Sequence, residues 1–392
     1  MSSPTIARWS RRFVGVGVLS LVLWALGLLV EVPARTEVVL ALYGFVLHVV
    51  FGKAYTLVPS YFDRTLVQPR LAGVHWTSTV TGTACLALAP FEAAPASLDV
   101  LGGVLWCAGV LIFIGGLVWS IRDNLTGAAT GTSGVNAPRQ RIDRVSNAFV
   151  PVALVYLLFG SIETLASTGA VPSVFDGYPP RATHLLAAGT ATLLVFAIGF
   201  RLLPRFLRAY PPSGLVYVVL PTGAVAPIAL ALTLPAGGGF QIAAALQGVA
   251  IVGYAIVIGV LFGRSPARRV ALYGVGLGAV AGVVAVGIGV WMAIAGVDPT
   301  FAVAHRRLTL VGFLGLTIVG VSLQFYPPNV GVWPGCTDRT AALAMAALAG
   351  GLGLHAAGLI AQTGALSTGG AVLVAAGVSG YAYLIGGAFR AK

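Results

Sequence analysis

The sequence predicts an all-α integral membrane protein with about 12 transmembrane helices. Three observations carry this prediction: the bulk composition, the length of the apolar runs, and a spacing of Gly and Pro that recurs three times. Of the 392 residues, 58% are apolar and 9% are charged, and the mean hydropathy is +0.94. Soluble domains carry about 25% charged residues, so the composition indicates a chain whose partner is the lipid bilayer. The three cysteines form no CxxC motif, which favours neither a disulfide framework nor a thiolate metal site.

Apolar runs of about 20 residues have the length needed to cross a bilayer as a helix. The chain contains such runs at 13–31, 37–60, 71–90, 100–121, 146–168, 182–204, 213–234, 240–263, 269–294, 303–326, 340–361 and 366–389. The first run follows three arginines, as in a signal peptide, but no small-residue cleavage site and soluble domain come after it. We therefore expect it to be retained, within a single transmembrane domain that covers residues 1–392.

The distribution of arginine predicts the orientation. If the N-terminus is cytoplasmic, nearly every cytoplasmic loop carries arginine, whereas the outer side holds Arg35, Arg181, Arg306 and Arg307. This bias accounts for the net charge of +12, so no nucleic-acid partner is expected. We expect a multi-pass protein of the plasma membrane with both termini in the cytoplasm. The longest loop, 122–145, is rich in Gly, Thr, Ser, Asn and Arg and is expected to be a flexible cytoplasmic linker.

One stretch recurs along the chain and predicts internal repeats. Gly44–Pro59, GFVLHVVFGKAYTLVP, returns as Gly312–Pro327, GFLGLTIVGVSLQFYP, and more loosely as Gly189–Pro204, GTATLLVFAIGFRLLP. The fourth, eighth and twelfth expected helices also share a Gly followed, after four residues, by Ile-Gly. The chain is thereby divided into units of four helices, at approximately 13–121, 146–263 and 269–389. An even number of helices per unit gives parallel repeats around a pseudo-threefold axis, whereas inverted repeats need an odd number.

This architecture resembles subunit I, the catalytic subunit, of the heme-copper oxidases and the related NnrS-type heme- and copper-containing membrane proteins. The stretches HLLAAGTATLLVFAIGFRLLPRF and AHRRLTLVGFLGLTIVGVSLQFYPP resemble the His, Gly-Phe, Gly and Leu-Pro pattern of that superfamily. The resemblance covers most of the chain as architecture, but in sequence it is confined to the second, sixth and tenth helices. It implies a protein that binds heme, copper or both and acts in respiration or in handling nitric oxide. Respiratory-chain or other membrane subunits would be its partners.

The resemblance also implies candidate ligands. His48 stands on helix 2, where the oxidases place a low-spin heme ligand, and His184 stands on helix 6, where they place a copper ligand. His305 stands on helix 10, where the oxidases have two histidines, and helix 7 (213–234) lacks their histidine pair. The oxygen-reducing centre of the family is therefore expected to be incomplete.

The depth of each histidine follows from its distance to the proline that ends its copy of the repeated stretch. His184 and His305 lie 20 and 22 residues before that proline, and His48 lies 11 before it. At about 1.5 Å per residue, the first two share a depth near the outer surface, and His48 lies about 15 Å deeper. His184 and His305 can therefore face one another around the axis.

Each assignment has an alternative. The histidines are either metal or heme ligands, or side chains that bond a hydroxyl group or water. In the resembling family outer arginines pair with heme propionates, which implies this role for Arg306 and Arg307; the alternative is a reach to the interface. Glu163, a carboxylate well inside helix 5, is a candidate proton relay or ligand, or a residue paired with a Ser, Thr or Arg neighbour.

Three functions stay open at this point, and whether the chain is an enzyme stays open with them. The first is the heme- or copper-binding protein. The second is a small-solute transporter or channel whose path is lined by Glu163 and the intramembrane histidines. The third is a non-catalytic membrane subunit, and neither of the last two needs a cofactor. A bis-histidine pair at matching depth favours the first, and a polar stripe across the membrane favours the second.

Overall fold

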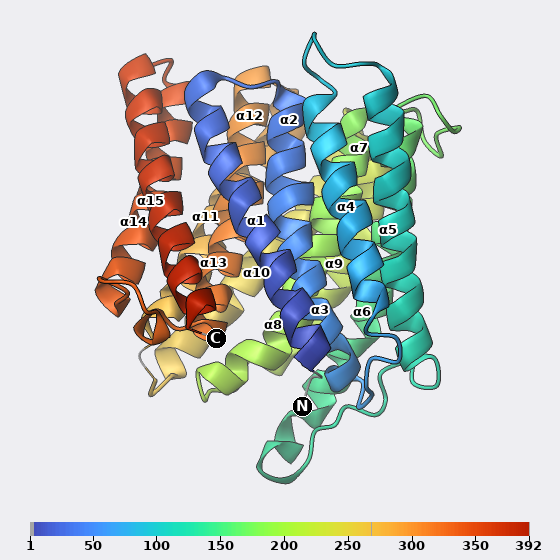
Figure 1. Ribbon diagram of the computed structural model, residues 1–392, viewed down its shortest axis with the longest axis vertical. Helices are drawn as coiled ribbons and strands as arrows, with labels where there is room; N and C mark the ends of the chain where they lie inside the picture. Colours follow the sequence, from blue (N-terminus) through green and yellow to red (C-terminus); the bar gives the residue numbers. More distant parts are fainter. Residues whose placement is uncertain (1–3, 268, 392) are drawn as a thin grey trace.

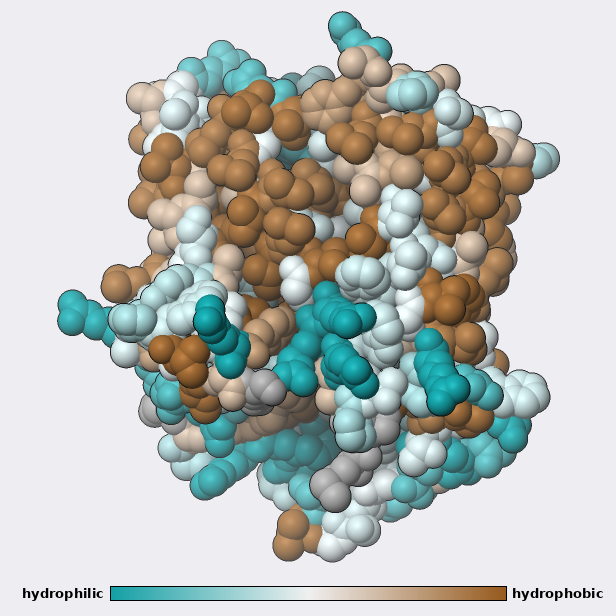
Figure 2. All heavy atoms as spheres, in the orientation of Figure 1, coloured by the Kyte–Doolittle hydropathy of each residue, from teal (hydrophilic) through white to brown (hydrophobic). Residues whose placement is uncertain are grey.

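The computed structural model describes residues 4–267 and 269–391. The described residues are 81% helical and form no strand. Eleven of their helices are long and apolar enough to cross a membrane, as expected for a multi-pass membrane protein. Figure 2 shows a broad band of hydrophobic side chains across the upper and middle part of the face in view, with hydrophilic side chains gathered below it and along the top edge.

Most expected spans correspond to single long helices that form the outer part of the bundle. These outer helices are α1 (Pro4–Val30), α4 (Leu71–Leu88), α5 (Ser97–Ile121), α6 (Gln140–Ala166), α9 (Ser213–Thr233), α10 (Gly238–Arg264), α11 (Tyr273–Ala295), α14 (Asp338–Ile360) and α15 (Gly364–Arg390). The helix α4 occupies the third expected span but is not among the eleven, because its 18 residues include a histidine and five hydroxyl side chains. It packs along α5 (Figure 1).

The three copies of the repeated stretch fold as composite helices, each interrupted by a π-helical segment. Their parts are α2 (Ala34–Val38), η1 (Val39–Leu47) and α3 (His48–Tyr61); α7 (Pro179–His184), η3 (Leu185–Thr192) and α8 (Leu193–Phe206); and α12 (Pro299–Arg307), η5 (Leu308–Gly315) and α13 (Leu316–Phe325). In their most apolar windows 83%, 89% and 78% of residues are buried, against 33–50% in the other eight candidate spans. The three composite helices are therefore the inner helices of the bundle.

The inner helices contact one another along their π segments, and the outer helices surround them. Successive groups of outer helices meet where α5 contacts α6, α10 contacts α11, and α15 contacts α1. Both termini lie at the lower end of the bundle in Figure 1. We call this the arginine-rich end, because the loops that carry Arg64 and Arg122 lie there, and η2 and α10 end there with Arg139 and Arg264.

The loop between α5 and α6 is shorter than the expected linker, 122–145. The 3₁₀-helix η2 (Gly134–Arg139) and the start of α6 at Gln140 occupy its second half. Its first half is tied to the bundle, since Asn124 Nδ2 donates to the carbonyls of Phe62 and Ala129, both at 2.8 Å. The loop therefore has a defined path across the arginine-rich end.

Candidate functional site

The candidate site is a cavity of about 470 Å³ at the end of the bundle opposite the termini. It lies among the three inner helices and the adjoining parts of α9, α10 and α11, and its walls are mostly apolar. The strongest polar groups on its walls belong to Arg35, His184, Gln247, His305 and Arg306. An apolar cavity with a few convergent polar groups is the usual form of a small-molecule or cofactor site.

His184 and His305 form a pair on the wall of this cavity, as their equal depth predicted. Their ring centroids lie 6.4 Å apart and their ring planes differ by 16°. His184 Nδ1 donates to the carbonyl of Pro180 at 2.7 Å, and His305 Nδ1 donates to the carbonyl of Ala285 at 2.8 Å. A carbonyl can only accept, so Nδ1 carries a proton in both rings, and in the neutral imidazole each Nε2 keeps its lone pair. The hydrogen bonds of the two rings among the described residues are those of Nδ1, so in the neutral form both Nε2 atoms can bind a metal.

The local sequence places the two histidines at the same level. Pro179 and Pro299 begin α7 and α12, where the missing N–H of proline costs nothing. Asp298 caps α12 by accepting from the N–H groups of Thr300 and Phe301. His184 directly precedes η3, and His305 stands three residues before η5. Because π segments are wider than α-helix and redirect neighbouring side chains, they affect where both rings point.

A charged network lies at the rim of the cavity and holds the two predicted arginines. Arg306 Nη2 lies 3.2 Å from Glu37 Oε2, and Arg307 binds the same carboxylate through Nε at 3.0 Å and Nη2 at 2.5 Å. Arg307 Nη1 also donates to His355 Nε2 at 2.5 Å, while His355 Nδ1 donates to the carbonyl of Ser367. Arg307 is thus committed to internal partners. Arg306 lines the cavity, and its Nε has no partner among the described residues.

His48 lies in a separate aromatic cluster, away from the histidine pair. It is fully buried at the start of α3, and its Nδ1 donates to the carbonyl of Tyr43 at 2.6 Å. Its ring lies 6.0 Å from that of Phe13 and 6.1 Å from that of Phe51, and His75 of α4 packs against the same two rings. His48 does not line the cavity of the histidine pair.

Glu163 fastens a loop at the end of α6. Its carboxylate accepts from Ser173 Oγ at 2.7 Å and from the N–H of Val174 at 2.6 Å. Arg181 of α7 bonds both oxygens of Asp176 in the same loop, at 2.7 and 2.8 Å, and holds the pKa of that carboxyl down at about 2. Both contacts fix the loop that leads into α7 and therefore help to place His184.

The described residues contain no group of three or more His, Cys, Asp and Glu side chains placed to hold a metal ion. The candidate donor set is therefore two imidazoles. No protein-family model matches the chain, and neither does any curated protein compared with it. The fold and the site together define a multi-pass helical membrane protein with a bis-histidine cavity.

Proposed function

We propose that the protein is a heme-binding membrane protein in which His184 and His305 would hold the heme iron. The proposal is based on the distance between the two imidazole rings. A metal–imidazole bond is about 2.0–2.1 Å, so the ring centroid lies about 3.2 Å from the metal, and two imidazoles bound on opposite sides of one metal have centroids about 6.4 Å apart. The two rings are 6.4 Å apart.

The donor set favours heme over a metal ion held by the protein alone. Zinc and copper sites in proteins generally have three or four protein ligands, whereas a heme brings four nitrogens and needs axial ligands only. The cavity volume of about 470 Å³ falls within the usual range for ligand pockets, about 300–1,000 Å³. Arg306 lines the cavity with 23% of its side chain exposed, and its guanidinium would be suited to a propionate.

The wider architecture supports a relation to heme-copper oxidase subunit I and the NnrS-type proteins. Three composite helices with a π segment at corresponding places support three parallel repeats around a pseudo-threefold axis, with α4 as the twelfth span. Termini at the arginine-rich end support their location in the cytoplasm, by the positive-inside rule. The membrane we propose is the plasma membrane.

The role that fits two axial histidines is electron transfer. A heme with both axial positions taken by protein exchanges electrons without binding a substrate at its iron. His184 and His305 would hold the group, Arg306 would neutralise its negative charge, and the apolar walls would exclude water. We propose that the chain serves respiration or the handling of nitric oxide in this way, with respiratory-chain or other membrane subunits as electron partners.

The test is an optical spectrum of the detergent-purified protein, expressed with heme supplied, in the oxidised and dithionite-reduced forms, together with iron and copper analysis. We expect a Soret band and sharp reduced α-bands that are lost in His184→Ala and in His305→Ala. His48→Ala is the matched control and should keep them. A purified protein that contains copper and no heme would refute heme as the cofactor and identify copper instead. A colourless, metal-free protein would refute the proposal and leave the small-solute transporter and the non-catalytic subunit as the remaining functions.

A further inference from the structure

Three arginines gather around the start of α9, at the arginine-rich end of the bundle. Arg139 ends η2, Arg141 is the second residue of α6, and Arg264 ends α10. The guanidinium carbon of Arg139 lies 4.5 Å from the ring centroid of Tyr210, in the loop before α9, and Arg264 Nη1 donates to the carbonyl of the same tyrosine at 3.3 Å. The guanidinium carbon of Arg141 lies 5.5 Å from the ring centroid of Tyr217 in α9. We call these three arginines the arginine cluster.

The arginine cluster has no acidic partner among the described residues. None of the ion pairs found there involves any of its three side chains. Two carboxylates of the same end of the bundle are bound elsewhere, since Asp143 pairs with Arg201 and Arg205, and Asp123 pairs with Arg64. The described part of the chain therefore leaves the positive charge of the cluster without a neutralising carboxylate.

The tyrosine rings hold two of these guanidinium groups in a way that suits an anion. A ring contacts the face of a guanidinium group, whereas the N–H groups lie in its plane and can bind a phosphate in a bidentate manner. Arg141 and Arg264 are exposed, and 48% of Tyr210 is exposed. The cluster therefore lies at the surface of the protein, where a phosphate group can reach it.

An apolar stripe begins on α9 next to the cluster. Val218, Val225 and Leu232 are 44%, 54% and 63% exposed. They are spaced by seven residues, about two helical turns, so they share one face of the helix. Because α9 is a candidate membrane span, this face meets lipid. The stripe extends about 21 Å from its first to its last residue, more than the roughly 15 Å of one half of the hydrocarbon core.

We propose that the arginine cluster binds the headgroup of an anionic phospholipid whose acyl chains lie along the apolar stripe of α9. The phosphate of such a lipid lies directly outside the hydrocarbon core, which is the level at which the stripe begins and the cluster lies. A free phosphate ion would use the charge of the cluster and leave the stripe unused. The proposal does not depend on heme, because no residue of the histidine pair takes part in it.

The test is native mass spectrometry of the full chain in detergent, titrated with phosphatidylglycerol or with phosphatidylcholine of the same acyl chains. We expect phosphatidylglycerol to bind more tightly. An arginine near an anionic lipid contributes enough that Arg139→Gln or Arg264→Gln alone should weaken this binding about fivefold, and the double variant about 30-fold.

The matched control is the double variant Arg12→Gln/Arg122→Gln. These two arginines lie over the rings of Trp9 and Trp119, at 4.5 and 4.6 Å from the ring centroids. The control removes the same charge from the same end of the bundle and also removes contacts between arginine and an aromatic ring. It should leave the affinity for phosphatidylglycerol unchanged, because neither arginine belongs to the cluster.

Three results would overturn the proposal. The first is equal binding of the two lipids by the unmodified protein. The second is a loss of affinity in Arg139→Gln/Arg264→Gln that is no larger than in the control. The third is displacement of phosphatidylglycerol by an excess of inorganic phosphate, which would identify a site for the free anion. Failure of the heme proposal leaves all these measurements unchanged, so the two proposals are tested separately.

Discussion

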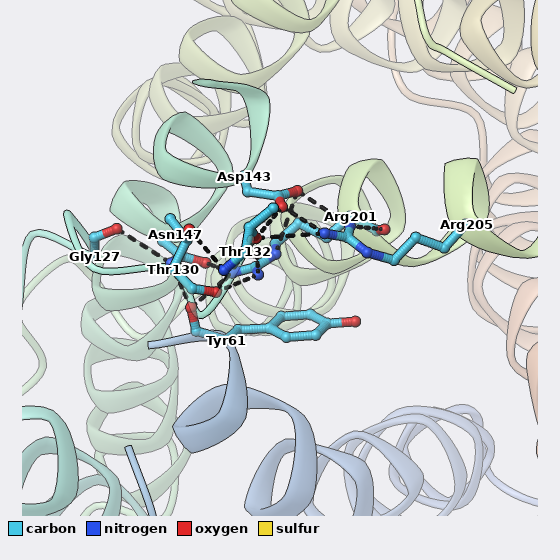
Figure 3. Close-up of polar contacts among 8 residues, drawn as sticks. All are labelled: Tyr61, Gly127, Thr130, Thr132, Asp143, Asn147, Arg201 and Arg205. Atoms are coloured by element: carbon cyan, nitrogen blue, oxygen red, sulfur yellow. Dashed lines mark hydrogen bonds and ion pairs between the residues drawn. The ribbon is translucent and has the colours of Figure 1, made fainter. Parts of the chain in front are cut away.

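Substitution of Arg201 by methionine tests how the arginine-rich end is held together. Arg201 lies on α8, and 4% of its side chain is exposed. Its guanidinium donates to the carbonyls of Tyr61 at 2.7 Å and Thr130 at 2.9 Å and to Asn147 Oδ1 at 2.5 Å, and its Nε lies 3.5 Å from Asp143 Oδ1 (Figure 3). These partners belong to α3, the α5–α6 loop and α6. One side chain therefore joins three segments that are distant in sequence.

The expected cost follows from what the substitution leaves behind. Methionine keeps most of the apolar stem but removes every donor, so the carbonyls of Tyr61 and Thr130 lose a charged partner. Breaking a buried ion pair costs about 3–5 kcal/mol. Asp143 keeps Arg205, at 2.5 Å, and the hydroxyl of Thr132, at 2.6 Å, as partners. We therefore expect Arg201→Met to lower the free energy of unfolding by about 3 kcal/mol, at the lower end of that range.

The assay is denaturant unfolding in detergent, combined with trypsin cleavage after Arg139 and Arg141, which border the tied loop. Arg201→Met should unfold at lower denaturant concentration and should be cut faster. Arg208→Met is the matched control, because Arg208 is exposed near the same end of the bundle. A change in unfolding free energy below about 1 kcal/mol, with cleavage no faster than in the control, would show that the network does not hold the loop.

Three further predictions concern packing and the outer loop. Gly320→Ala should lower the free energy of thermal unfolding by about 1–3 kcal/mol, because the added Cβ would stand 2.7 Å from a backbone carbonyl oxygen. Gly15→Ala is the control, since its added Cβ would meet nothing within 4 Å and should cause no such loss. Arg181 lowers the pKa of Asp176 to about 2, so the contribution of this pair to stability is complete above about pH 4 and is lost as the pH falls through 2. Asp176→Asn should therefore make the free energy of unfolding less dependent on pH between about 4 and 2. Glu163→Ala should cost about 2 kcal/mol and speed proteolysis of the loop, since it leaves a hydroxyl and a backbone N–H without their acceptor; equal proteolysis rates would contradict this.

Repeated sequence features predicted the histidine pair well. His184 and His305 stand 20 and 22 residues before matching prolines, and a helix has a fixed rise, so a similar depth could be calculated without a structure. The π segments could not be predicted. A helix with i→i+5 bonds and one with i→i+4 bonds have the same hydropathy, and the Gly and Pro spacing marks only where the three helices correspond.

Polar partners that are distant in sequence were also missed. Arg307 and Glu37 are 270 residues apart, and no local pattern connects them. A long cationic side chain near the end of a transmembrane helix usually extends to the membrane interface. Arg201 is buried instead, because the loop expected to be a flexible linker supplies carbonyl and hydroxyl acceptors around it. A hydropathy profile cannot show such acceptors, since they come largely from the backbone of a polar segment.

The segment η3 links the fold to the proposed site, and deletion of Ala188 within it tests that link. A π segment accommodates about one more residue than the α-helix it replaces, so the deletion should let η3 return to α geometry. The wider turns of the π segment take up the extra residue, so its loss should change how the residues before it are set relative to α8. Because α8 is held by the Arg201 contacts, this change should fall on the short helix α7 and turn His184 away from His305. We expect the heme spectrum to be lost as completely as in His184→Ala, and to return when an alanine is added after Thr192. An unchanged spectrum after the deletion would mean that the π segment does not orient His184.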